Sequence, residues 1–181
     1  MKNLLRFLAL AVLLVFAVRA TEEVVSAVHG TITKLDSTSK TFVVKTKDGT
    51  EHTVHFADKT AVSGADKTAA GAKDIFKGLS EGSEVVVHYT EKDSEKTATE
   101  VDKVGKGGLK YVDGTVTKVG QDGKTVVVKS ADGTEHTFDV AGHDTAEAAK
   151  GIGKAADKSG KVTVYYAEEG GKKVAHFFEK L

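Results

Sequence analysis

Apolar and polar residues alternate in short runs along most of the chain, and glycine, aspartate or lysine separates the runs. Alternation with a period of two predicts strands that bury one face and leave the other in water. The dipeptide Asp48-Gly49 favours a type I′ hairpin turn between the second and third strands. In the first half of the chain the pattern predicts strands at 28–35, 41–46, 51–57, 84–90 and 97–104.

Between the third and fourth strands the apolar spacing becomes helical. Ser63 followed by Asp66 resembles a capping box, and Gly78 is a suitable helix stop. In the second half, Asp144 and Glu147 stand at the corresponding place. We therefore predict one helix between strands three and four of each half. In the first half its apolar face comprises Ala65, Thr68, Ala69, Ala72, Ile75, Phe76 and Leu79.

The two halves are copies of one another. The segment 30–34 matches 114–118, and 48–53 matches 132–137, both at an offset of 84 residues. After Ala57 and Ala141 the register slips by seven, so that 85–89 matches 162–166 at an offset of 77. Two copies of ~80 residues are too few and too long for a solenoid. They predict two small domains, residues 21–107 and 108–181, joined at the flexible glycine-rich stretch 105–108.

The order strand–strand–strand–helix–strand–strand is that of an OB-fold. With the repeated motifs Gly-Thr-Val-Thr-Lys (114–118), Asp-Gly-Thr-Glu-His (48–52 and 132–136) and Val-Thr-Val-Tyr-Tyr (162–166), the chain resembles small exported bacterial OB-like domains of unknown function. The resemblance covers nearly all of the mature chain, twice. It implies a mainly β protein of two tandem five-stranded barrels, each with one helix, and it implies no chemistry. A different small barrel or a sandwich also fits the pattern.

Residues 1–20 have the layout of a secretory signal peptide. Lys2 and Arg6 precede an apolar run of eleven residues, Leu8 to Val18, and small residues follow at positions 18 and 20. A membrane span needs ~20 apolar residues, so this run is too short. No cysteine follows it, which excludes a lipoprotein anchor. We expect cleavage after Ala20, a periplasmic or secreted protein, and no membrane span after cleavage.

Removal of this segment makes the chain slightly acidic. The 26 basic and 26 acidic residues of the full chain balance, but three basic residues, both arginines among them, lie within 1–20, which leaves a net charge of −3. Binding to single-stranded nucleic acid needs a basic groove and stacking aromatics, so no nucleic-acid partner is expected. The absence of cysteine excludes disulfides, cysteine-bound zinc and iron–sulfur clusters.

Catalytic motifs are also absent from the sequence. Serines are few, and there is no Gly-x-Ser-x-Gly, His-Glu-x-x-His or phosphate-binding loop. We therefore expect a protein that is not an enzyme and needs no cofactor.

The candidates for metal binding are the histidines, of which only His52 and His136 occupy equivalent positions in the two copies. His52 and His55 point to opposite faces of one strand, so they cannot share an ion. A two-residue turn would place Lys45 across from His52 and Lys129 across from His136, and a neighbouring ammonium disfavours a bound cation. Surface histidines are the favoured reading, and a specific metal site is the alternative. The seven are His29, His52, His55, His88, His136, His143 and His176.

These patterns predict an exported, non-catalytic binding or structural protein of the bacterial cell envelope, whose partner is an unknown macromolecule or glycan. The alternative is a periplasmic metal or small-ligand binder that uses strand histidines. The candidate recognition face is the polar hairpin surface of strands two and three, 45–55 and 129–139, though solvated strands explain it equally well. Its weak candidate residues are Glu51, His52, Glu135 and His136. The sequence makes no prediction of oligomeric state.

Overall fold

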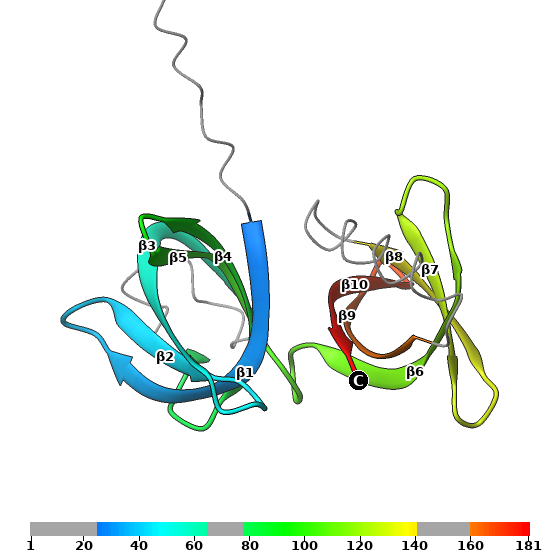
Figure 1. The fold of residues 1–181 in the computed structure, drawn as a ribbon, viewed down its shortest axis with the longest axis horizontal. Helices are drawn as coiled ribbons and strands as arrows, with labels where there is room; N and C mark the ends of the chain where they lie inside the picture. The colour runs from blue at the N-terminus through cyan, green and yellow to red at the C-terminus, as the bar shows by residue number, and fades with distance from the viewer. Residues whose placement is uncertain (1–24, 65–77, 141–159) are drawn as a thin grey trace, which may run out of the picture.

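The computed structural model describes residues 25–64, 78–140 and 160–181. The protein is mainly β, as predicted (Figure 1). Among these residues no helix is long and apolar enough to cross a membrane. The strands are β1 (Val25–Asp36), β2 (Thr41–Lys45), β3 (Glu51–Ser63), β4 (Glu84–Lys92), β5 (Glu95–Lys103), β6 (Lys110–Val119), β7 (Thr125–Ser130), β8 (Glu135–Val140), β9 (Lys161–Glu169) and β10 (Lys172–Lys180).

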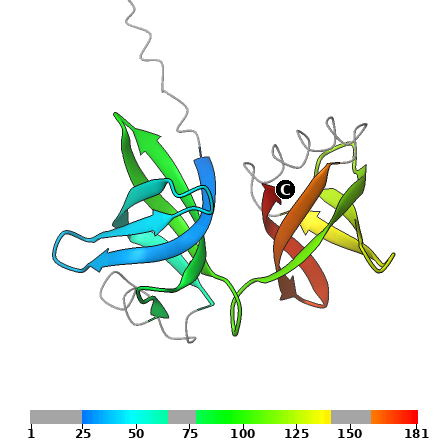
Figure 2. The same cartoon turned by 60° about the horizontal axis from the view of Figure 1, so that its bottom comes forward.

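The strands form two closed barrels that lie side by side and are joined by the passage from β5 to β6 (Figures 1 and 2). The strand order is β1-β2-β3-β5-β4 in the first barrel and β10-β8-β7-β6-β9 in the second. In each barrel one pairing is parallel, β3 with β5 and β8 with β10, and the others are antiparallel. Closure satisfies the backbone groups that an edge strand would leave open.

The hairpin between β2 and β3 differs from the predicted type I′ turn. Gly49 alone has a positive φ in this turn, +89°. Its N–H donates to the Thr46 carbonyl, and the Thr46 N–H donates to the Thr50 carbonyl. One left-handed glycine after an i to i+3 hydrogen bond marks a type I turn with a G1 bulge. The longer turn pairs Lys45 with Glu51 and Val44 with His52, so the prediction of Lys45 opposite His52 is wrong.

The β3 strand also runs further than predicted, to Ser63. Its last residues pair with β5, Val62 opposite Val101 and Ser63 opposite Asp102. A partner about forty residues away leaves no local sequence signal, and this explains the early stop in the prediction. The predicted helices lie outside the described residues, except that Leu79 is buried in the first core.

Each barrel has its own hydrophobic core, and the two cores use equivalent strands. The first contains Phe42 and Val54, and the second contains Val126 and Phe138, all buried. Inward and outward positions alternate along these strands. Within the runs 42–44 and 126–128, the first and third residues therefore pack inside the barrels, whereas Val43 and Val127 are half-buried on the opposite face.

The β4 and β9 strands break this alternation, because five consecutive residues are buried in each. One face of β4 packs in the barrel core through Val85 and Val87. The opposite face is covered as well: Val86 belongs to an apolar cluster with Val104, Leu109 and Tyr165, against which Ala167 and Phe177 pack. The two barrels therefore touch, and they meet through equivalent outer faces, β4 and β5 of the first against β9 and β10 of the second.

Candidate metal centre

The four predicted site residues lie at equivalent places in two separate barrels. Glu51 and Glu135 are exposed at the starts of β3 and β8. His52 and His136 are half-buried and share a strand face with the buried Val54 and Phe138, so they point toward the barrel interior instead of outward. The structure therefore provides one glutamate and one histidine per barrel, on opposite faces of the same strand.

His136 has a neighbouring ammonium, but the lysine is not the predicted one. Lys173 Nζ lies 2.9 Å from His136 Nδ1, and Ser130 Oγ lies 3.2 Å from Nε2. Because an ammonium can only donate, Nδ1 is the acceptor in this contact. Lys173 comes from β10, whereas Lys129 pairs with Glu135. With both ring nitrogens engaged and a cation beside it, His136 is a poor metal ligand.

A different set of side chains converges between the barrels. His88 on β4 and Glu100 and Asp102 on β5 place one ligand atom each within 4.8 Å of one another. His176, on β10 of the second barrel, lies with Nδ1 3.2 Å from Asp102 Oδ2. His88 Nε2 lies 3.9 Å from the same oxygen. We call these four residues the histidine–carboxylate cluster.

Strand register explains why these residues meet. His88 is the cross-strand partner of Glu100, and Asp102 pairs with Val86, so all three project from the outer face of the β4–β5 pair. His176 has no cross-strand partner in the β9–β10 register, because Ala175 pairs with Tyr166 and Phe177 with Tyr165. It is therefore the extra residue of a β-bulge. Bulges redirect side chains, and this one aims an imidazole at the first barrel.

His88 and Asp102 are buried, Glu100 and His176 are half-buried, and the pKa values of Glu100 and His176 are raised. Burial and the charge of Asp102 raise the pKa of Glu100. Burial alone would lower the pKa of His176, but its hydrogen bond to Asp102 and the charges of Asp102, Glu100 and Glu169 outweigh that effect and raise it. Asp102 is fully buried, and its Oδ1 has no hydrogen-bond partner among the described residues. A buried carboxylate is costly in free energy unless a cation lies beside it.

Two imidazoles and two carboxylates form a donor set suited to borderline divalent ions such as Zn²⁺. Soft ions prefer thiolate and thioether sulfur. The chain has no cysteine, and its only methionine is Met1, so sulfur ligands play no part in this cluster.

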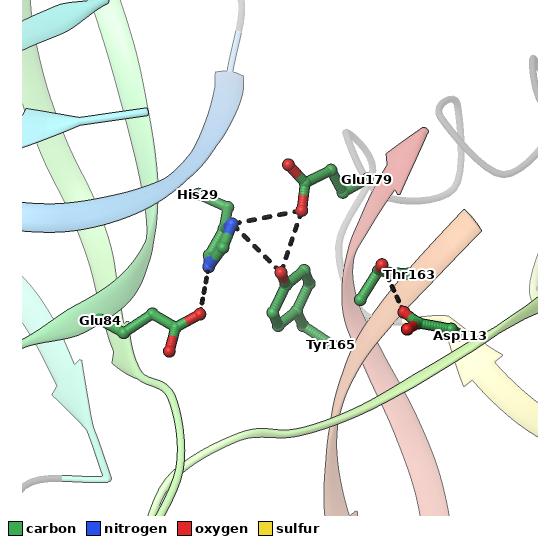
Figure 3. Close-up of polar contacts among 6 residues, drawn as sticks. All are labelled: His29, Glu84, Asp113, Thr163, Tyr165 and Glu179. Atoms are coloured by element: carbon green, nitrogen blue, oxygen red, sulfur yellow. Dashed lines mark hydrogen bonds and ion pairs between the residues drawn. The ribbon is translucent and has the colours of Figure 1, made fainter. Parts of the chain in front are cut away.

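A second polar group crosses between the barrels (Figure 3). His29 of β1 lies 2.9 Å from Glu84 Oε1 through Nε2. Its Nδ1 lies 3.1 Å from the Tyr165 hydroxyl and 3.3 Å from Glu179 Oε2 of the second barrel. Tyr165 donates to Glu179 at 3.0 Å, and burial together with this carboxylate raises the pKa of the phenol far above its ordinary value. We call these four residues the His29–Tyr165 network.

The cluster and the network are built on equivalent positions of the repeat. At the offset of 77 residues, His88 corresponds to Tyr165 and Asp102 to Glu179. The paired strands agree, since His88 lies opposite Glu100 as Tyr165 lies opposite Phe177. The same two positions therefore carry an imidazole and a carboxylate in the first barrel and a phenol and a carboxylate in the second.

The sequence analysis missed these residues because it favoured histidines that recur in both copies. His29, His88 and His176 do not recur. A usable signal was the unbroken run 85–89 with its counterpart 162–166, since a strand buried on both faces implies a second packing partner. That signal indicates an interface at His88, but it does not identify His176 as the residue that meets it.

Comparisons with known proteins establish no family for this chain. No family model matches it, and no curated protein matches it. Among solved structures, the chain is similar to the crystal structure of Ag(I)CusF with a TM-score of 0.34 and 10% sequence identity. The match covers 44% of this chain and 97% of the CusF chain. A similarity at this level carries no argument about function.

Proposed function

We propose that this chain is an exported, non-catalytic protein that binds a divalent transition-metal ion, with Zn²⁺ the best match to its donors. The observation that carries the proposal is the histidine–carboxylate cluster, in which His88, Glu100 and Asp102 converge within 4.8 Å and His176 reaches the same carboxylate. This develops the metal-binding alternative raised by the sequence. It assigns the binding to other histidines than His52 and His136.

The spacing of the cluster supports tetrahedral coordination. Zinc–ligand bonds of ~2.0–2.2 Å put neighbouring ligand atoms of a tetrahedron ~3.3–3.6 Å apart. The separations of 3.2 Å for His176 to Asp102 and 3.9 Å for His88 to Asp102 are close to that value.

Groups around the cluster also suit a bound metal. Metal-bound histidines usually donate their second ring N–H to a carboxylate. His176 would bind through Nδ1, and Glu169 Oε1 lies 3.6 Å from its Nε2. Ser63 Oγ lies 3.5 Å from Glu100 Oε1. Four protein donors covered by both barrels leave no open coordination position for a substrate, which supports binding without catalysis.

The remaining sequence predictions enter the proposal unchanged. The strand order of both barrels supports OB-like domains. A helix between strands three and four of each stays a prediction from the sequence. The layout of residues 1–20 supports export to the periplasm or medium, and mass spectrometry of the exported protein should give a chain that begins at Thr21. Recognition of an envelope macromolecule or glycan stays a prediction, and of its four candidate residues Glu51 and Glu135 are exposed.

Calorimetric titration of the mature, chelator-treated protein with ZnCl₂ tests the proposal. We expect one ion per chain, and loss of binding in the pair His88→Ala and Asp102→Asn. The matched control is the pair His52→Ala and His136→Ala, which removes the repeated histidines and should bind normally. Circular dichroism checks that both variants are folded. The proposal fails if the control loses zinc while the cluster variant keeps it, or if the wild type binds none.

A further inference from the structure

We infer that a metal ion in the histidine–carboxylate cluster clamps the two barrels together, so that metal binding controls their relative orientation. The inference rests on the proposed function and adds a role to it. Its basis is the division of the donors, because His88, Glu100 and Asp102 come from the first barrel and His176 comes from the second. An ion bound by all four residues would link the two barrels through its coordination bonds.

The chain itself connects the barrels only once. Between the end of β5 and the start of β6 lie six residues, 104–109, in which Gly105 and Gly107 have positive φ. The loop closes on itself, since Leu109 N–H donates to the Lys103 carbonyl and Gly105 N–H donates to the Leu109 carbonyl. A small glycine-containing loop of this kind joins the barrels at one point and leaves their angle to be set by contacts elsewhere.

Among the residues that the structure describes, those contacts form three groups. The apolar cluster around Val86 and Tyr165 lies between two polar ones, the histidine–carboxylate cluster and the His29–Tyr165 network. In the first polar group the His176–Asp102 pair crosses the interface. Coordination would add bonds from one ion to both of these residues, and it would tie them to His88 and Glu100 as well. Metal binding therefore strengthens one side of the interface selectively.

The His29–Tyr165 network supplies an internal comparison. It joins the same two faces by hydrogen bonds between His29, Tyr165 and Glu179, with no need for a metal. Weakening it should loosen the barrels whether or not zinc is present. Weakening the cluster should abolish only the part of the restraint that zinc provides.

The experiment measures the interbarrel distance directly. Because the chain has no cysteine, Ser37→Cys and Gln121→Cys give two specific sites for spin labels, one in an exposed turn of each barrel. Double electron–electron resonance of the mature protein is recorded with chelator and with ZnCl₂, a diamagnetic ion. We expect zinc to narrow the distance distribution.

The informative variant is His176→Thr, because threonine is the natural residue at the equivalent position 99 of the first copy. In this variant zinc should no longer narrow the distance distribution. Its zinc affinity should fall by at least ~10–100-fold, the usual cost of losing an outer-shell partner of a metal ligand. The matched control, His29→Ala with Tyr165→Phe, should broaden the distribution in both states and keep the narrowing by zinc.

The outcomes separate the two proposals. If the wild type binds no zinc, the proposed function fails. If it binds zinc but the distribution does not narrow, or if His176→Thr binds and narrows like the wild type, the site lies within the first barrel and the clamp is overturned. Thermal melting of each labelled variant shows that a lost response is not lost folding, and His176→Gln repeats the test if the threonine variant melts early.

Discussion

At the scale of single residues, the same turn chemistry recurs in both copies. Asp48 accepts the Thr50 N–H at 3.0 Å, and Asp132 accepts the Thr134 N–H at 2.9 Å. Each carboxylate also accepts the hydroxyl at the start of its turn, from Thr46 or Ser130. These bonds favour the ionised form, so the Ser130 hydroxyl and the Thr134 N–H lower the pKa of Asp132 from its ordinary 3.8 to about 2.

This shift predicts an acid-sensitive contribution to stability. A pKa that is lower in the folded state than the 3.8 of the unfolded state adds stability above pH 3.8, and this stability is lost as the pH falls toward 2. Urea denaturation across that window should show a smaller acid loss for Asp132→Asn than for the wild type. Above pH 5 the difference between the two proteins should be constant, and a difference that keeps changing there would contradict the assignment.

His176 predicts the opposite dependence in the metal-free protein. Its folded pKa is raised above 6.5, so its contribution is complete below pH 6.5 and is lost as the pH rises through the folded pKa. The raised pKa of Glu100 acts in the same direction from 4.5 upward. With chelator present, the wild-type melting temperature should fall as the pH rises above 6.5, and His176→Thr should show a smaller fall. Equal falls in both proteins would assign the titration to another group.

At the scale of elements, two glycines allow the first strand of each barrel to change partners. Around Gly30, β1 passes from its pairing with β4 to its pairing with β2. A Cβ there would lie 2.4 Å from the Lys45 carbonyl oxygen, and one at Gly114 would lie 2.6 Å from that of Lys129. Glycine at a barrel corner permits this close approach of two backbones.

Alanine at either position should therefore destabilise its barrel. We expect Gly30→Ala and Gly114→Ala each to cost ~1–3 kcal/mol in the free energy of unfolding, the usual penalty for overpacking. Gly120→Ala is the matched control, because its Cβ would meet nothing nearer than 3.3 Å. Urea titrations of the three variants measure the effect. A control as unstable as the other two would show that the penalty comes from backbone freedom and not from the close contact.

The elements also show what sequence can and cannot predict here. Alternation predicts β2 well, because it reports local burial, and the predicted start of β4 at Glu84 also agrees with the structure. It misses the end of β3, where the partner is distant, and it reads Asp48-Gly49 as the wrong turn, because that dipeptide serves more than one hairpin type. The cluster is harder still. His176 meets Asp102 because of a bulge and across an interface. Neither feature changes the hydrophobic periodicity of the sequence in a recognisable way.

At the scale of the whole molecule, each barrel has a core of its own and a share of a common interface. Chains of residues 21–106 and 108–181 should each unfold cooperatively, because each retains five strands and a closed core. Both should melt below the intact protein, since separation exposes Val86 and Tyr165. Thermal melts of the two pieces and of the intact chain test this. If neither piece folds, the barrels are one cooperative unit and the division near Gly107 is wrong.

The two contact faces carry different residues at equivalent positions, and this affects which substitutions the protein can accept. In a dimer of two identical barrels every substitution on the contact face occurs twice, so an imidazole could not become a phenol on one side alone. In a fused chain the faces vary independently. One carries His88, Glu100 and Asp102, while the other carries Tyr165 and Glu179. The two faces of a fused chain can therefore differ, as the two subunits of a heterodimer can. Because both barrels belong to one polypeptide, they are always present in equal number.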